Sequence, residues 1–213
     1  MFEMKEGLMD KKAADKYIRK YSRVFEKVLK NTSTENVDVG LSEYTSRLSK
    51  MYASDEFKKH NVYPSMNTVH IYAVIAMCLE LKETGMSDKD IIDAINKGFS
   101  RRRNFFKNII AFINILPNSY EIAKKWNISD HENRVKDGSI TYDYFDVGMD
   151  KIEYRISKCM YVEMFESYGI RGLCKIFCMI DEYSYAGLTR RVKFIRHSDL
   201  SDGDSCFDEI IRK

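Results

Sequence analysis

The sequence predicts an α+β fold, in which an N-terminal bundle of five or six helices precedes a β-β-α-α-β-β unit with a small antiparallel sheet. Two observations lead to this order. As far as residue 136, apolar side chains recur at three- and four-residue steps, which is the spacing of amphipathic helices. From Asp137-Gly138 onward, apolar and polar side chains alternate, as they do in half-buried strands. We therefore expect a helical region (1–136) and an α+β region (137–213), packed as one compact unit.

Breakers and capping residues mark the ends of the N-terminal helices. Gly85 is suited to end a long apolar helix, because glycine readily takes the left-handed conformation that follows a helix. Ser87 has the character of an N-cap with an acidic first turn after it, and Pro117 would end the helix that precedes it. The helices expected from these signals cover residues 11–30, 41–52, 66–81, 87–99, 101–116 and 119–135.

The C-terminal third is expected to hold two pairs of strands with two helices between them. Turns at 148–150 and at Asp202-Gly203 would join the strands of each pair, and Gly169 would divide the helices. The expected strands cover residues 140–146, 151–157, 191–197 and 206–211, and the expected helices cover 158–168 and 172–183.

Composition excludes several functional classes. Hydrophobic residues make up 44% of the chain and charged residues 31%, which is typical of a globular protein and not of a disordered one. The net charge of +3 results from 35 basic and 32 acidic side chains, a balance that indicates neither nucleic acid nor an anionic membrane as a partner. Even the densest basic cluster, Arg101-Arg102-Arg103, is expected to be a solvated helix face.

The chain carries no signal for a membrane or for secretion. No apolar run approaches the roughly 18 residues that a bilayer crossing needs, and the N-terminus lacks the apolar core of a signal peptide. Five cysteines are an odd number, which favours reduced thiols in the cytoplasm. We expect a small-molecule substrate and no cofactor, and the aromatic content of 13% would permit a homodimer.

Four of the five cysteines lie among charged residues in the last third of the chain. Cys159 and Glu163 share one helix face, because they are four residues apart. Cys174, Cys178 and Asp181 share one edge of the next helix. Each set also has a simpler interpretation, an exposed acidic surface for the first and small buried side chains for the second. Four cysteines could instead bind zinc, although no CxxC pair occurs.

Arg196 and His197 are neighbours in an expected strand, so their side chains should point to opposite faces of the sheet. Arginine suits bidentate recognition of a carboxylate, and histidine suits proton transfer near neutral pH. At most one of the two can face a given site, and we expect it to be Arg196.

A series of short motifs follows in a fixed order through the C-terminal region. They are Ser157-Lys158-Cys159, Tyr161, Glu163, the Tyr168-Gly169-Ile170 break, Cys178-Met179-Ile180-Asp181, Arg196 and Gly203-Asp204-Ser205-Cys206. In this order and spacing, residues 138–213 resemble the L-2-amino-thiazoline-4-carboxylic acid hydrolase family. One departure is the end of the last motif, which is Cys206-Phe207-Asp208 where the family shows Cys-Asp-Phe or Cys-x-Phe.

The resemblance implies the hydrolytic opening of a 2-amino-thiazoline ring by attack at its C2 carbon. Such a substrate has a carboxylate and an amidine-like carbon, so its site needs a cation, carboxylates, and a nucleophile or an activated water. Our hypothesis is that Arg196 binds the carboxylate, that Glu163 and Asp181 act as amidinium partners or general base, and that Cys159 is the nucleophile. The helix N-terminus could lower the pKa of the Cys159 thiol, and water activated by Glu163 is an alternative.

Two further residues and one rival function complete these expectations. Cys178 and Cys206 are predicted on the substrate-binding side, and no metal is predicted. The β-β-α-α-β-β unit with a terminal Gly-Asp-x-Cys strand also resembles the 4-vinyl reductase domain. This second resemblance implies a non-catalytic domain that binds a small molecule or a metal.

Overall fold

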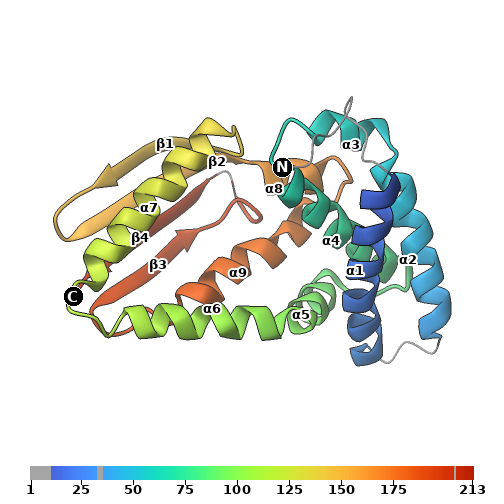
Figure 1. Cartoon of the computed structure of the whole chain (residues 1–213), viewed down its shortest axis with the longest axis horizontal. Coiled ribbons are helices and arrows are strands. Elements are labelled where there is room, and N and C mark those ends of the chain that lie inside the picture. The colour runs from blue at the N-terminus through green and yellow to red at the C-terminus, as the bar shows by residue number, and fades with distance from the viewer. Residues whose placement is uncertain (1–10, 33–35, 204) are drawn as a thin grey trace. The chain divides into compact units, whose positions relative to one another are not determined.

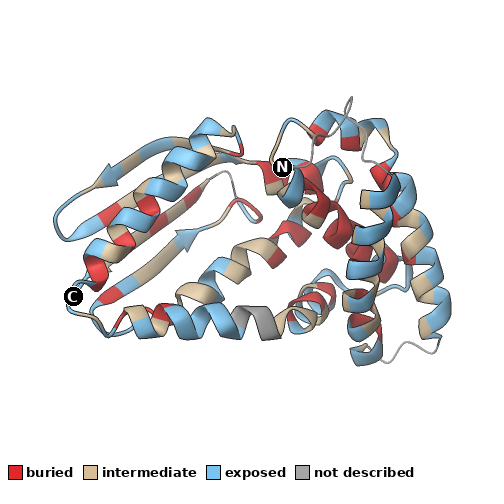
Figure 2. Ribbon diagram, viewed as in Figure 1, coloured by how far each residue is buried: buried red, intermediate tan, exposed pale blue. Residues whose placement is uncertain are grey.

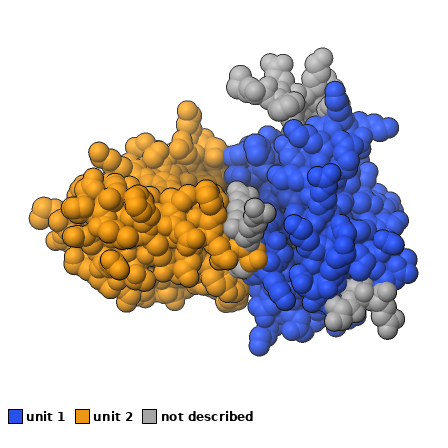
Figure 3. Space-filling model, turned by 60° about the horizontal axis from the view of Figure 1, so that its bottom comes forward, with its two compact units in different colours: residues 1–99 blue, residues 100–213 orange. Residues whose placement is uncertain are grey.

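The computed structural model describes residues 11–32, 36–203 and 205–213, except for the side chains of residues 101–103. The predicted solvated face of Arg101-Arg102-Arg103 therefore lies outside the described residues. The chain divides into two compact units, residues 1–99 and residues 100–213 (Figure 3). Each unit is described by itself, and the expected boundary at residue 136 stays a prediction.

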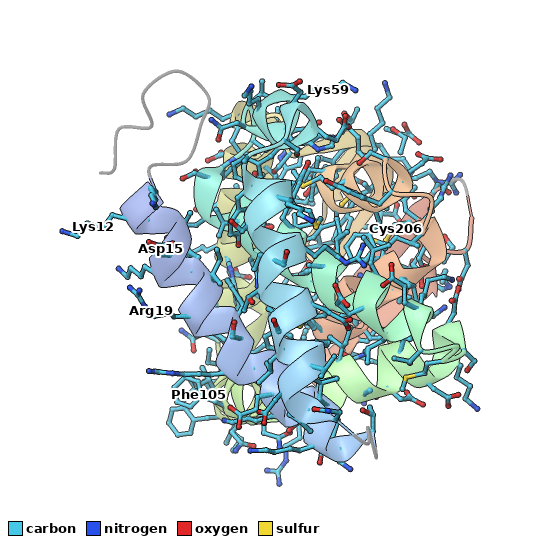
Figure 4. The ribbon with its side chains drawn as sticks, turned by 90° about the vertical axis from the view of Figure 1, so that its right-hand side faces the viewer. Lys12, Asp15, Arg19, Lys59, Phe105 and Cys206 are labelled. Atoms are coloured by element: carbon cyan, nitrogen blue, oxygen red, sulfur yellow. The ribbon has the colours of Figure 1, made fainter. Side chains whose placement is uncertain are left out.

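Unit 1 is helical in the part of it that the structure describes. Its helices are α1 (Lys11–Asn31), α2 (Val37–Tyr52), α3 (Asp55–His60), α4 (Ser65–Glu83) and α5 (Asp88–Gly98) (Figure 1). Helix α4 is buried along most of its length (Figure 2), as its nearly continuous apolar sequence requires. In contrast, Lys12, Asp15 and Arg19 project from the solvent face of α1 (Figure 4).

Capping side chains explain where the helices of unit 1 begin. Ser87 accepts a hydrogen bond from the Asp90 backbone N–H, which confirms its predicted role as the N-cap of α5. Asn36 caps α2 through the Val39 N–H, so this helix begins four residues earlier than Leu41, where the sequence placed it. Helix α3 was not predicted, because its single short turn, capped by Ser54, is too short to show a period.

Unit 2 contains the predicted β-β-α-α-β-β unit, preceded by two helices. The elements are α6 (Ser100–Ile113), α7 (Ser119–Lys136), β1 (Ile140–Val147), β2 (Lys151–Cys159), α8 (Met160–Glu166), the 3-10 helix η2 (Arg171–Cys174), α9 (Lys175–Tyr185), β3 (Val192–Ser198) and β4 (Cys206–Arg212). All four strands pair antiparallel in the order β1-β2-β4-β3. The α+β fold is thus confirmed.

One face of this sheet packs against helices and the other stays open. Helix α7 lies across the inner face (Figure 1), where Tyr120 and Ala123 join Ile152, Val192 and Ile210 in the core of the unit. Since side chains alternate along a strand, the inner face also receives Arg196, which lies four positions after Val192 on β3.

The start of β3 is fixed to α6 by one buried side chain. Asn114, 1% exposed, donates to the Gly187 carbonyl and accepts hydrogen bonds from the backbone N–H groups of Arg191 and Val192. Gly187 permits the close approach, because a Cβ there would lie 2.7 Å from the Lys107 carbonyl oxygen. This connection sets the position of β3, and with it Arg196, relative to the helices.

Candidate active site

Arg196 and Asp208 form a buried ion pair on the inner face of the sheet. They are register partners on the neighbouring strands β3 and β4. Nε and Nη2 of Arg196 donate to the two carboxylate oxygens of Asp208 over 2.9 and 2.8 Å, and the side chains are 10% and 1% exposed. Sequence reasoning missed Asp208; the available signal was its place two residues after Cys206, on the same strand face.

Asp181 lies beside this pair, within reach of water. Its carboxylate is 3.9 Å from Nη2 of Arg196, and its side chain is 62% exposed. Burial nevertheless raises the pKa of Asp181 to about 6, although the charge of Arg196 opposes the shift. The exposed carboxylate is in contact with water, and its raised pKa reflects the groups packed around its base. Such a group can exchange a proton near neutral pH.

Cys178 takes part in the arrangement through its backbone. Nη1 of Arg196 donates to the Cys178 carbonyl oxygen over 2.7 Å, which ties α9 to β3. The Cys178 thiol forms a hydrogen bond with Cys174, one helical turn earlier, and this bond together with burial raises the pKa of Cys174. Cys174 is 1% exposed, as expected for a packing residue.

Cys159 lies at the junction of β2 and α8, where it is the N-cap residue of the helix. Burial raises the pKa of its thiol to about 11, and the backbone N–H groups of Tyr161 and Val162 only partly offset this effect. The start of α8 does lower this pKa as expected, but burial outweighs it, so the expectation of a thiol with a lowered pKa is wrong. The thiol is protonated at neutral pH.

The remaining predicted residues differ in their surroundings. Cys206, labelled in Figure 4, is 6% exposed, and burial raises the pKa of its thiol. Glu163 is exposed on α8. His197 points to the open face of the sheet, as expected, where it forms a 2.7 Å hydrogen bond with Glu209. The structure therefore brings together Arg196, Asp181 and the Cys178 backbone. Cys206 adjoins them through a hydrogen bond with Asp208, and Cys159 is close enough for the charge of Asp181 to act on its thiol.

A second charged group, which sequence reasoning also missed, adjoins the first. Arg134 of α7 is 26% exposed and contacts Asp130 of the same helix at 3.3 Å. Burial acts to lower the pKa of Arg134, but Asp130 and a side-chain hydrogen bond with Tyr161 outweigh it and raise this pKa. The charge of Arg134 also acts on Asp181. The helical pattern of residues 119–135 gave no signal that set Arg134 apart.

Three tyrosine side chains lie near the two charged groups. Tyr142 and Tyr154 of the sheet lie 6.0 Å apart between ring centroids, and Tyr185 of α9 stacks on Phe194 at 4.7 Å. Burial raises the pKa of all three tyrosines, and Asp208 or Asp181 acts on Tyr154 and Tyr185 in the same direction. Neutral hydroxyl groups are therefore available as hydrogen-bond donors and acceptors beside the charges.

The other features that could mark a site are less suited to chemistry. A surface groove of about 450 Å³ in unit 1 is lined by an ion-pair network between α2 and α4, in which Arg47 contacts Glu80 and Glu83.

Among the described residues, no group of three or more His, Cys, Asp or Glu side chains is arranged to hold a metal ion. None of the helices in the described part of the chain combines the length and apolar character that a bilayer crossing requires.

Fold and site together define an α+β protein with a partly exposed carboxylate of raised pKa beside a buried arginine–aspartate pair, a combination suited to acid–base chemistry. The chain belongs to the L-2-amino-thiazoline-4-carboxylic acid hydrolase family, whose model matches residues 66–208. The match begins in α4, and so covers more of the chain than the predicted 138–213. Membership supports a hydrolase-like function at the level of the family. No curated protein matches the chain significantly.

Proposed function

We propose that this protein is a hydrolase that opens a small cyclic amidine, such as 2-amino-thiazoline-4-carboxylate, by attack of water at the C2 carbon. The observation that carries the proposal is the position of Asp181, exposed to water and 3.9 Å from Arg196, with a pKa of about 6. Above that pH the carboxylate is ionised and can accept a proton from water.

The charges of the cluster favour an amidinium group as its ligand. Arg196 contributes one positive charge, whereas Asp208 and ionised Asp181 contribute two negative charges. Of the two carboxylates, Asp208 already accepts two hydrogen bonds from Arg196. Asp181 is therefore the carboxylate left to hold the amidinium or to activate water, and a bound cation would compensate the net negative charge.

The proposed reaction consumes one water. As Asp181 takes its proton, the water oxygen forms a bond to C2, and the bond between C2 and the ring sulfur then breaks. Sulfur leaves as a thiolate and receives the proton, which gives an N-carbamoyl-cysteine type product. We assign the base to Asp181 in preference to the exposed Glu163. We also prefer water to a covalent route through Cys159, because that thiol has a pKa of about 11.

The proposal is tested by incubating the purified protein with 2-amino-thiazoline-4-carboxylate and measuring thiol release and product mass. Asp181→Asn should lower kcat by about 10²-fold or more, whereas Glu182→Gln, which neutralises the next exposed carboxylate, should leave it unchanged. Stoichiometric bound metal without any thiol release would contradict the hydrolase and favour the 4-vinyl reductase-like binding domain. Equal activity of Asp181→Asn and wild type would contradict the assigned base.

We further propose that the protein works on its small-molecule substrate in the cytoplasm. All five cysteines are free, which supports a reducing compartment. Thiol titration of the protein isolated under alkylating conditions should find five reduced cysteines, and fewer would contradict the proposal.

A further inference from the structure

Arg134 is a better anion-binding group than Arg196, although the sequence indicated Arg196. We propose that Arg134, together with Tyr161, binds the carboxylate of the substrate, while Asp181 holds its amidinium end. The inference rests on the proposed function and names the class of ligand, a small molecule with a carboxylate at one end and an amidinium at the other.

The donors of Arg196 are already engaged within the protein. An arginine side chain has five N–H donors. In Arg196, Nε and Nη2 each donate to Asp208, and Nη1 donates to the Cys178 carbonyl. The side chain is 10% exposed, so a ligand carboxylate has little access to the remaining donors. Arg196 therefore holds β3, β4 and α9 together and positions Asp208 and Asp181.

Charge also argues against a carboxylate at Arg196. An incoming anion would meet Asp208 and Asp181 at the same guanidinium, and like charges at such short range repel. The same two carboxylates attract a cation. The end of the site at Arg196 is thus selective for the positive end of a ligand.

Arg134 is more exposed than Arg196 and is held by fewer protein groups. Its side chain is 26% exposed, and its ion pair is a 3.3 Å contact between Nε and Asp130, whose side chain is 49% exposed. A contact between a half-buried and an exposed side chain four residues apart on one helix contributes little. The terminal Nη groups can therefore turn to an incoming carboxylate at small cost, and the Tyr161 hydroxyl beside them can donate a further hydrogen bond.

Tyr161 connects Arg134 to the Asp181 end of the site. Tyr161, which shares a hydrogen bond with Arg134, packs against Phe177 of α9 with ring centroids 4.7 Å apart. Phe177 lies one helical turn before Asp181, so the two side chains lie on the same face of α9. In agreement, the pKa of Tyr161 responds to the charges of both Arg134 and Asp181. Arg134 and Asp181 therefore both lie near the Tyr161 side chain.

The test compares 2-amino-thiazoline-4-carboxylate with 2-amino-thiazoline, which lacks the carboxylate. Binding of each is measured by calorimetry, and turnover by thiol release, for wild type, Arg134→Gln and the control Lys125→Gln, which removes an exposed cation from the same helix. Arg134→Gln should weaken binding of the acid about 10- to 100-fold and leave binding of the decarboxylated analogue unchanged. Lys125→Gln should change neither.

A second variant should act in the opposite direction. Asp130→Asn removes the carboxylate that competes for Arg134, and should tighten binding of the acid about two- to fivefold. A merely structural role for Arg134 would not produce this gain. Arg134→Lys should restore part of the loss, because it keeps the charge but not the bidentate geometry.

The outcomes separate this inference from the proposed function. Equal loss of both ligands in Arg134→Gln, or no loss of either, would overturn the role of Arg134. Wild type that binds the acid through Arg134 but never releases thiol would support the anion site and overturn the hydrolase. Wild type that binds neither compound would overturn both.

Discussion

Asp208 is 1% exposed and accepts two hydrogen bonds from Arg196, so neutralising it should strongly destabilise unit 2. Breaking a buried ion pair by removing one partner costs about 3–5 kcal/mol, because the other charge stays buried without compensation. Asp208→Asn keeps one oxygen as an acceptor, and Asp181 remains near Arg196, so we expect about 3 kcal/mol, at the low end of that range. At roughly 4 °C per kcal/mol for a unit of this size, the Tm should fall by about 12 °C.

Thermal and urea unfolding followed by circular dichroism measure this change. Glu209→Gln is the matched control, because it is the next residue on β4 and makes the same change from carboxylate to amide. Its partner His197 is 42% exposed on the open face of the sheet, so the cost there should be below about 1 kcal/mol. The double replacement Arg196→Met with Asp208→Leu should recover much of the loss. An Asp208→Asn variant no less stable than Glu209→Gln would refute the buried pair.

Two further replacements test other parts of the structure. Cys159→Ser should retain most of the turnover, because the thiol is protonated at neutral pH; a loss of about 10³-fold or more in kcat would instead identify a covalent nucleophile. Gly187→Ala should lower the free energy of unfolding by roughly 1–3 kcal/mol, since the new Cβ would lie 2.7 Å from the Lys107 carbonyl oxygen and 2.8 Å from the Ala111 nitrogen. Its control is Gly172→Ala, where a Cβ meets nothing within 4 Å and the change in stability should be small; equal losses in the two variants would contradict the close approach at Gly187.

The elements of the fold could be predicted because their signals are local. Period-two alternation located all four strands to within two residues at either end, and Gly85 and Gly169 take the positive φ angles expected where helices end. Helix α3 was missed because a helix of six residues is too short to show a period in the sequence. The early start of α2 was missed because it depends on the Asn36 cap.

The site was only partly predictable, because its contacts depend on register and on packing between elements. The alternation of strand residues correctly separated Arg196 from His197. It could not reveal that Arg196 lies opposite Asp208, since the pairing of β3 with β4 is set by the whole sheet. Arg134 was missed for a related reason: its neighbour Tyr161 comes from another helix, and helical periodicity says nothing about contacts between helices.

The pH dependence of kcat/KM tests the central claim, that Asp181 is the base of a hydrolytic site, most directly. Asp181 has a pKa of about 6 in the folded protein, so its basic form is lost as the pH falls through that value. We predict that kcat/KM of the wild type falls about tenfold per pH unit below pH 6. The residual activity of Asp181→Asn should lack this acid limb, and the substrate titrates equally in both. A wild-type profile that is flat through pH 6, or one that Asp181→Asn shares, would contradict the claim.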